Sequence, residues 1–205
     1  SNRPWTDHPF QTCRDSLYSS YQSSWARIDL TLQEMKRAGT EIARFEIPWL
    51  NIETRVDRSY DWELTDRIMR AFQRYAVRPL PILVSCSLNA GSGLTPRLHP
   101  ACAPDMIHFA RAFLDRYAGQ IEYLEIGNEP NQIYFVEDFG WGRPHDKYFT
   151  ELLVPVAAAL HQTHPNIKIL NGGEFRQLPD YMFWNSMIPA LGRREVPLDH
   201  IDVFS

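Results

Sequence analysis

From residue 28 onward, segments with a helical spacing of apolar residues alternate with segments that have the spacing of strands. Stretches with apolar residues three and four positions apart are typical of amphipathic helices. They are found at 28–39, 64–75, 104–117, 148–163 and 180–191. Short apolar or alternating runs, typical of strands, lie between them. They are found at 41–47, 79–84, 121–127, 167–171 and, as a strand start, 200–205.

This strict succession of strands and helices predicts a parallel sheet with crossover helices. The glycine fingerprints of open nucleotide-binding sheets are missing after every strand. Polar residues instead gather at the carboxyl ends of several strands, where barrel enzymes place their chemistry. We therefore expect an α/β fold, a (β/α)8 TIM barrel that is incomplete in this chain and comprises roughly strands two to six. It forms one partial domain over 1–205, with an irregular segment at 1–25.

Composition narrows the classes of function. The 205 residues are 44% hydrophobic and 22% charged, as in ordinary soluble domains. A net charge of -4 argues against a nucleic-acid partner. No apolar run approaches the roughly 20 residues that cross a bilayer, so no membrane partner is expected, and localisation stays unknown.

Cysteine and histidine spacing predicts neither a metal nor a cofactor. The three cysteines, Cys13, Cys86 and Cys102, are too irregularly spaced for a zinc site or a disulfide framework, and we expect free or buried thiols. The seven histidines show no metal-binding spacing.

Two strands direct charged residues to one side. Alternation over 41–47 places Arg44 and Glu46 on the face that points into a barrel. Alternation over 121–129 places Glu125 and Glu129 on the equivalent face. A buried charge must be paired, so the deeper Glu125 is expected to form a structural ion pair with Arg44. Glu129, at the rim, is expected to meet substrate. The alternative for these charges is a purely structural ion pair.

These runs resemble clan GH-A glycoside hydrolases, in particular the β-xylosidase and iduronidase-like family and its relatives. The resemblance covers roughly residues 27–205 and is most specific at Asn128-Glu129-Pro130. The matching runs are 44–49, 52–53, 60–62, 80–83, 125–131 and 169–173. It implies a retaining hydrolase of β-linked glycosides that needs no cofactor.

The resemblance also implies catalytic roles. Glu129 is then the general acid/base, Asn128 binds the sugar 2-hydroxyl, and Arg44 steadies the nucleophile. One departure is visible, because relatives often have Trp where this chain has Gly127. We expect that change either to enlarge the pocket or to remove a ring on which a sugar stacks.

Substrate-binding candidates lie near strand ends and in the loops that follow them. Aromatic rings offer flat apolar area to a sugar face, and polar groups bind its hydroxyls. The candidates are Trp49, Glu46, Asn131, Tyr134, Trp141 and His99. The alternative is that the rings pack under their own loops and that the histidine is merely solvated.

The nucleophile is the difficulty. In the resembled enzymes it ends strand seven, whereas residues 200–205 would be strand six here. We therefore expect the nucleophile outside this chain, on a longer chain or a second polypeptide that completes the barrel, and the 205 residues alone to be inactive. Glu174 is the one substitute within the chain. The alternative function is a non-catalytic barrel that binds carbohydrate or protein; a glutamate ending a later strand would distinguish the two.

Overall fold

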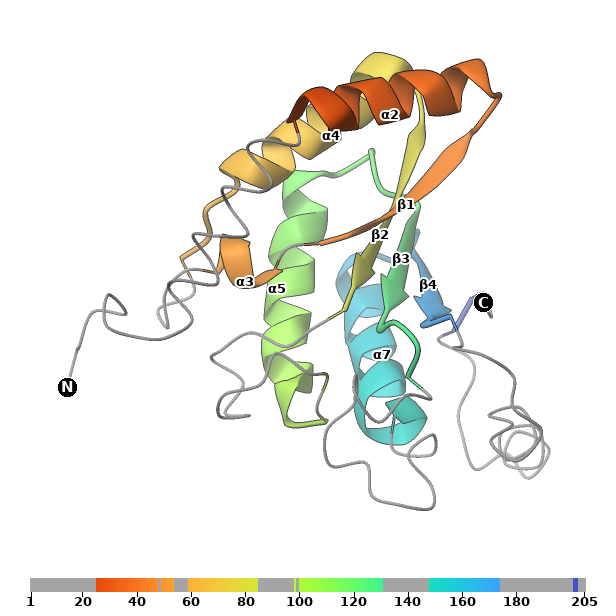
Figure 1. The fold of residues 1–205 in the computed structure, drawn as a ribbon. Helices are drawn as coiled ribbons and strands as arrows, with labels where there is room; N and C mark the ends of the chain where they lie inside the picture. Colours follow the sequence, from red (N-terminus) through yellow and green to blue (C-terminus); the bar gives the residue numbers. More distant parts are fainter. Residues whose placement is uncertain are drawn as a thin grey trace. The chain divides into compact units, whose positions relative to one another are not determined.

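A computed structural model describes residues 25–47, 49–53, 59–84, 98, 100–130, 148–173 and 201–202 (Figure 1). Its contacts group the chain into two compact units, which are described separately. The first unit takes residues 1–43 and 48–78, and the second takes 44–47 and 79–205. In each unit, helices bury apolar residues, among them Leu64 and Phe72 in the first unit and Phe109 and Leu160 in the second.

The first unit contains helices α2 (Trp25–Arg37), α3 (Trp49–Ile52) and α4 (Glu63–Tyr75). Helices α2 and α4 pack against each other. The Asp61 carboxylate accepts a hydrogen bond from the Glu63 backbone N–H at the start of α4, which satisfies a free helix donor. Helix α4 ends at Ala76 in a left-handed conformation, and the Lys36 ammonium of α2 donates to the Ala76 carbonyl. Both ends of α4 are thus fixed.

A four-stranded sheet has the order β1-β2-β3-β4, which is also the order along the chain. Its strands are β1 (Ile42–Glu46), β2 (Arg78–Leu83), β3 (Tyr123–Ile126) and β4 (Lys168–Asn171). Strand β3 pairs in parallel with β2 and with β4, and the register sets Ile82 against Glu125 and Ile126 against Asn171. The carboxyl ends of these three strands therefore meet at one edge, as Figure 1 shows.

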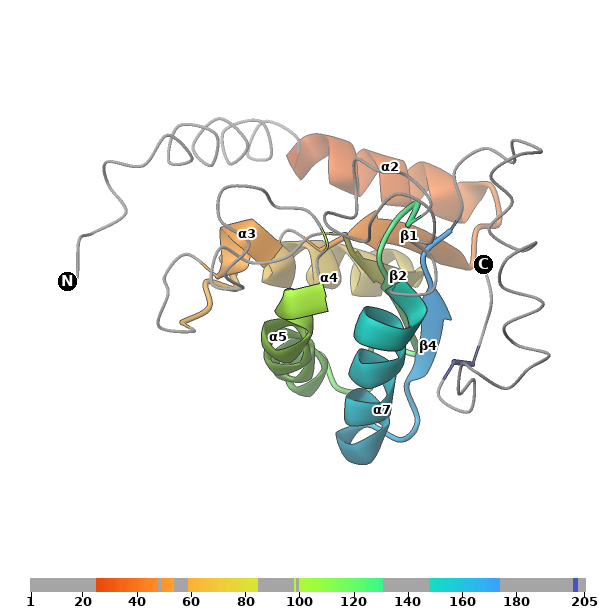
Figure 2. The same cartoon turned by 90° about the horizontal axis from the view of Figure 1, so that it is seen from below.

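Two helices pack side by side in the second unit (Figure 2). Helix α5 (Ala103–Arg116) follows a 3₁₀ turn at Pro100–Cys102, and helix α7 (Val154–Thr163) follows a π-helical turn at Tyr148–Leu153. Their apolar residues join those of the strands in a core whose members are fully buried, each contributing about 1.5–3 kcal/mol. The core includes Phe109, Phe113, Leu124, Ile126, Phe149, Leu152, Leu160 and Ile169.

The predicted succession of strands and helices is confirmed wherever the structure describes it, with shifts of a few residues at the ends. One predicted helix is different, because 148–163 begins with a π-turn. Pro155 near the start of α7 has no N–H to give and its ring obstructs the carbonyl four residues back, which disfavours one continuous α-helix. The expected helix at 180–191 and segment 1–24 lie outside the described residues.

The described strands form an open sheet, not a closed barrel. Ile201 and Asp202, the described part of the expected strand at 200–205, are not in a strand. Asp202 nevertheless lies beside β4, because its backbone N–H donates to the Ile169 carbonyl at 3.0 Å and its carboxylate accepts from the Ile169 N–H at 2.8 Å. This is the edge at which a further strand would add.

Two expectations from composition can now be compared with the fold. Cys102 is fully buried, as one of the two expected alternatives had it, but it is disulfide-bonded, so the expectation that it keeps a thiol is wrong. Cys13 and Cys86 lie outside the described residues, and spacing alone does not reveal which cysteines bond. Within the described part of the chain, no helix has the length and apolar character needed to cross a bilayer.

Candidate active site

The candidate site lies where β3 ends and the chain turns. Gly127 has a φ of +86° and Glu129 a φ of +47°, both in the left-handed region. The Gly127 N–H donates to the Leu83 carbonyl at 2.7 Å, and the Glu129 N–H donates to the Gly173 carbonyl at 2.8 Å. The turn that presents Glu129 is therefore bonded to the chain on both sides of β3.

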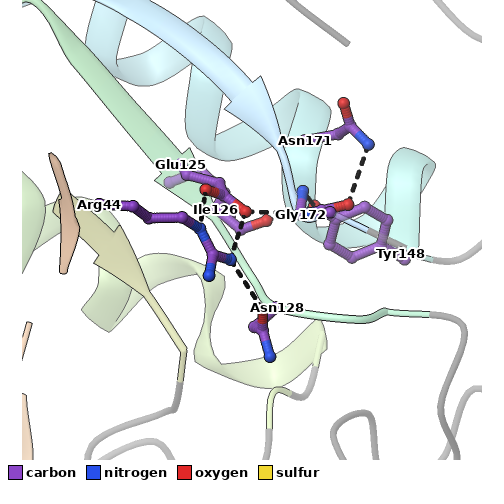
Figure 3. A network of polar contacts seen from close by, with 8 residues as sticks. Arg44, Glu125, Ile126, Asn128, Tyr148, Asn171 and Gly172 are labelled. Atoms are coloured by element: carbon purple, nitrogen blue, oxygen red, sulfur yellow. Dashed lines mark hydrogen bonds and ion pairs between the residues drawn. The ribbon is translucent and has the colours of Figure 1, made fainter. Parts of the chain in front are cut away.

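Arg44 and Glu125 form a two-bond ion pair across the sheet (Figure 3). The Arg44 Nε donates to Oε2 of Glu125 at 2.7 Å, and its Nη2 donates to Oε1 at 2.8 Å. Parallel bonds of this kind are both strong and orienting. The predicted pairing is confirmed, but only one partner is buried, since the side chain of Glu125 is 2% exposed and that of Arg44 is 42% exposed. The open sheet leaves the guanidinium uncovered.

The pair extends into a network that reaches the turn. Nη2 of Arg44 also donates to Oδ1 of Asn128 at 2.7 Å, and the Gly173 N–H donates to Oε1 of Glu125 at 3.0 Å. The hydrogen bond to Glu125 is the main cause that raises the pKa of Arg44; burial opposes the shift, and the charges of Glu125, Glu46 and Glu129 favour it. Arg44 thus stays a cation that holds Asn128 beside Glu129.

The other sequence candidates are placed as follows. Glu46 is exposed in β1, and Glu129 is half-buried at the end of β3. Trp49 is 1% exposed and donates from Nε1 to the Glu53 carboxylate at 2.7 Å. A ring that is buried in this way offers no face to a sugar, so the packing alternative holds for Trp49. The remaining candidates are outside the described residues: Asn131, Tyr134, Trp141, His99 and Glu174.

Tyr148 belongs to this site although the sequence indicated it only as the start of a helix. It is fully buried, and its hydroxyl donates to the Ile126 carbonyl and accepts from the Gly172 N–H at 2.8 Å (Figure 3). Burial raises the pKa of Tyr148, so the hydroxyl keeps the proton that it donates. Asn171, also buried, donates from Nδ2 to the Gly172 carbonyl at 3.0 Å.

Gly127 has a packing reason in this chain. A Cβ placed on it would lie 2.9 Å from Cδ1 of Leu98 and 3.2 Å from Cε2 of Tyr148, and its positive φ disfavours any side chain. The space next to Gly127 is therefore already filled by Leu98 and Tyr148. Tyr148 occupies the volume that a larger residue at this position would need.

The described residues contain no group of three histidine, cysteine or acidic side chains placed to hold a metal ion. The chemistry that the site can perform with its own groups is proton transfer by Glu129, supported by a fixed cation and a fixed amide. Such a combination suits a reaction in which charge develops on oxygen atoms.

Comparison with known proteins shows which folds this chain resembles. Neither protein-family models nor curated proteins match the sequence. Solved structures do match. The family 39 glycoside hydrolase from Xanthomonas axonopodis pv. citri has a TM-score of 0.58 and 18% identity, over 85% of this chain and 36% of that one. The family 39 β-xylosidase from Caulobacter crescentus gives 0.58 and 16%, over 88% and 42%.

A family 1 β-glucosidase from Thermotoga maritima also matches, with a TM-score of 0.56 and 13% identity, over 72% of this chain and 37% of that one. The fold of the described residues resembles part of the barrel of these clan GH-A glycoside hydrolases. The chain spans about two fifths of the length of these neighbours or less. The predicted TIM-barrel architecture and the resemblance to this clan are therefore confirmed, for the part of the barrel that the chain contains.

Proposed function

We propose that this chain is the part of a retaining β-glycoside hydrolase that holds the general acid/base, Glu129. The observation that supports it most is the network of Arg44, Glu125 and Asn128 at the carboxyl end of β3, directly before Glu129. In a barrel, the carboxyl ends of the strands are where catalytic groups lie. The fold is that of glycoside hydrolases, and the carboxylate stands at that end.

Breaking a glycosidic bond requires a proton on the leaving oxygen and a carboxylate for the oxocarbenium-like centre. Glu129 is half-buried at the strand end, so it can meet a substrate and still be partly shielded from water. Because Oδ1 of Asn128 accepts from Arg44, the Asn128 amide is left to offer its N–H donors to a sugar hydroxyl. In this proposal Asn128 binds the 2-hydroxyl and Glu129 protonates the leaving group.

The second carboxylate of a retaining pair lies about 5–5.5 Å from the first. We place it on a barrel strand beyond the four of the described sheet, supplied by a longer chain or by a second polypeptide. Arg44, exposed on one side, is the cation that would steady it. β-Xylosides and β-glucosides are the first substrates to test, because matched structures are named a β-xylosidase and a β-glucosidase.

The test compares wild-type and Glu129→Gln full-length protein on two sets of aryl β-glycosides, one with poor and one with activated leaving groups. Protonation by a positioned group contributes about 10²–10⁴-fold, and only poor leaving groups need it. The variant should lose about that much kcat/KM on poor leaving groups and little on activated ones. Equal activity of the two proteins on an unactivated glycoside would refute the role of Glu129, and absence of hydrolysis by the wild type would favour a non-catalytic binding barrel.

A further inference from the structure

Tyr148 interrupts the hydrogen-bond ladder between β3 and β4 at its last step. The two strands pair in parallel from Tyr123 opposite Lys168 to Ile126 opposite Asn171. The ladder begins with the Lys168 N–H, which donates to the Glu122 carbonyl at 2.9 Å. Side chains and bonds repeat every two residues along a strand. A regular ladder would therefore end with a bond from the Gly172 N–H to the Ile126 carbonyl.

That bond is replaced by two bonds through a side chain. The Gly172 N–H donates to the Tyr148 hydroxyl at 2.8 Å, and the hydroxyl donates to the Ile126 carbonyl. Both backbone groups are thereby satisfied although the hydroxyl oxygen stands between them, as Figure 3 shows. The position is fully buried, so water cannot easily take the place of the hydroxyl.

The next connection between the two chains is the one that fixes the candidate catalytic residue. The Glu129 N–H donates to the Gly173 carbonyl at 2.8 Å. Residues 126–129 and 172–173 are therefore joined at both ends, by Tyr148 at one end and by this bond at the other. Between these two connections both sides advance by two residues, 127–128 and 172–173, so the register of the strands is kept. The positive φ of Gly127 and of Glu129 instead turns the β3 side out of the strand, and this turn at 127–129 is the arch on which Asn128 and Glu129 lie.

Two glycines, Gly127 and Gly172, permit this arrangement of the backbone. A Cβ on Gly172 would lie 2.6 Å from the Gly127 carbonyl oxygen, so the two backbones touch where the hydroxyl enters. The Gly127 conformation, at a φ of +86°, begins the arch. Gly173 also donates to Oε1 of Glu125, which connects the arch to the ion pair with Arg44.

We infer that Tyr148 is a positioning residue for Glu129: its hydroxyl, inserted between the ends of β3 and β4, sets the arch that aims the carboxyl at the leaving oxygen. This inference rests on the proposed function. Tyr148 touches no substrate in this role and acts through the backbone alone. Removing its hydroxyl lets the Gly172 N–H approach the Ile126 carbonyl directly, which flattens the arch and moves Glu129.

The experiment is Tyr148→Phe in the full-length protein, assayed as kcat/KM on aryl β-glycosides of graded leaving-group ability beside wild type and Glu129→Gln. A displacement of about 1 Å at a reacting group costs on the order of 10²-fold. We expect a loss of up to about that size on poor leaving groups, and less than about threefold on activated ones, which need no proton.

The dependence of the loss on the leaving group separates a positioning role from a folding role, because a smaller folded fraction lowers the apparent kcat/KM of all substrates by the same factor. Tyr117→Phe is the matched control, since Tyr117 is buried at the end of α5, away from the arch. This control should change kcat/KM by the same factor for every substrate, or not at all. If Tyr148→Phe does not fold, Gly172→Ala acts on the same backbone contact and should show the same selective loss.

Two outcomes overturn the inference. Uniform loss across substrates in Tyr148→Phe would reduce Tyr148 to a packing residue, and unchanged rates would show that the hydroxyl does not set the arch; in both cases Glu129→Gln still shows its selective loss. If Glu129→Gln itself shows no selective loss, the proposed function fails, and the inference about Tyr148 fails with it.

Discussion

The ion pair between Arg44 and Glu125 should be asymmetric, so that losing the arginine costs more stability than losing the glutamate. The Glu125 side chain is 2% exposed and the Arg44 side chain 42% exposed. In Arg44→Met, Glu125 stays buried, and among the described residues its remaining donor is the Gly173 N–H. A buried charge stripped of its partner costs about 3–5 kcal/mol.

In Glu125→Met, the arginine is not stranded in the same way. Water can reach its exposed side, and it keeps the hydrogen bond to Asn128. The losses are a partly exposed charged pair and one partner for the N–H of Gly173, a half-buried residue, together about 2 kcal/mol. The free energy of unfolding should therefore be lower in Arg44→Met than in Glu125→Met by about 1–3 kcal/mol.

Urea denaturation of the two single variants and of the double variant measures this. The double variant should cost less than the sum of the single ones, because the second substitution no longer leaves a charge unpaired. If Glu125→Met is as destabilising as Arg44→Met or more so, the burial difference is not what governs the pair, and the reasoning is refuted.

Three further predictions follow from individual positions. Gly127→Ala should lose about 1–3 kcal/mol more stability than Gly119→Ala, since both have positive φ but, among the described residues, only the first meets a neighbour, Leu98, at 2.9 Å; equal losses would mean that the contact relaxes freely. The raised pKa of Tyr148 means that the unfolded chain releases this proton near the ordinary value of 10.0 while the folded chain keeps it. Stability should thus be full below that pH and fall above it by about 1.4 kcal/mol per pH unit, a component that Tyr148→Phe lacks in urea denaturation between pH about 9 and about 11. Purified residues 1–205 should not hydrolyse aryl β-glycosides, because the described sheet is not a closed barrel; normal turnover would make Glu174 the first residue to mutate.

The spacing of apolar residues along the chain was sufficient to predict most of the fold. Each strand needed only a short apolar or alternating run, and the order along the chain then gave a parallel sheet. The pairing of Arg44 with Glu125 was predictable too, because alternation placed both on one face and neither could remain there alone.

Other features depend on three-dimensional neighbours that no local pattern encodes. Trp49 was expected to face a sugar, but its place in α3 is set by the Glu53 carboxylate four residues on. The role of Tyr148 requires knowing that its hydroxyl reaches two strand ends at once. Gly127 looked like a lost side chain, whereas Leu98 and Tyr148 leave it no room for one.

The central claim, that Glu129 is the acid/base of a retaining enzyme, is tested most directly by azide rescue. Full-length Glu129→Ala is given an activated aryl β-glycoside with and without sodium azide, and the glycosyl azide formed is identified by NMR. With the base removed, the covalent intermediate should accumulate until azide attacks it, so azide should restore turnover and yield the β-azide. An α-azide would identify Glu129 as the nucleophile instead, and unchanged wild-type rates in the variant without azide would contradict any catalytic role.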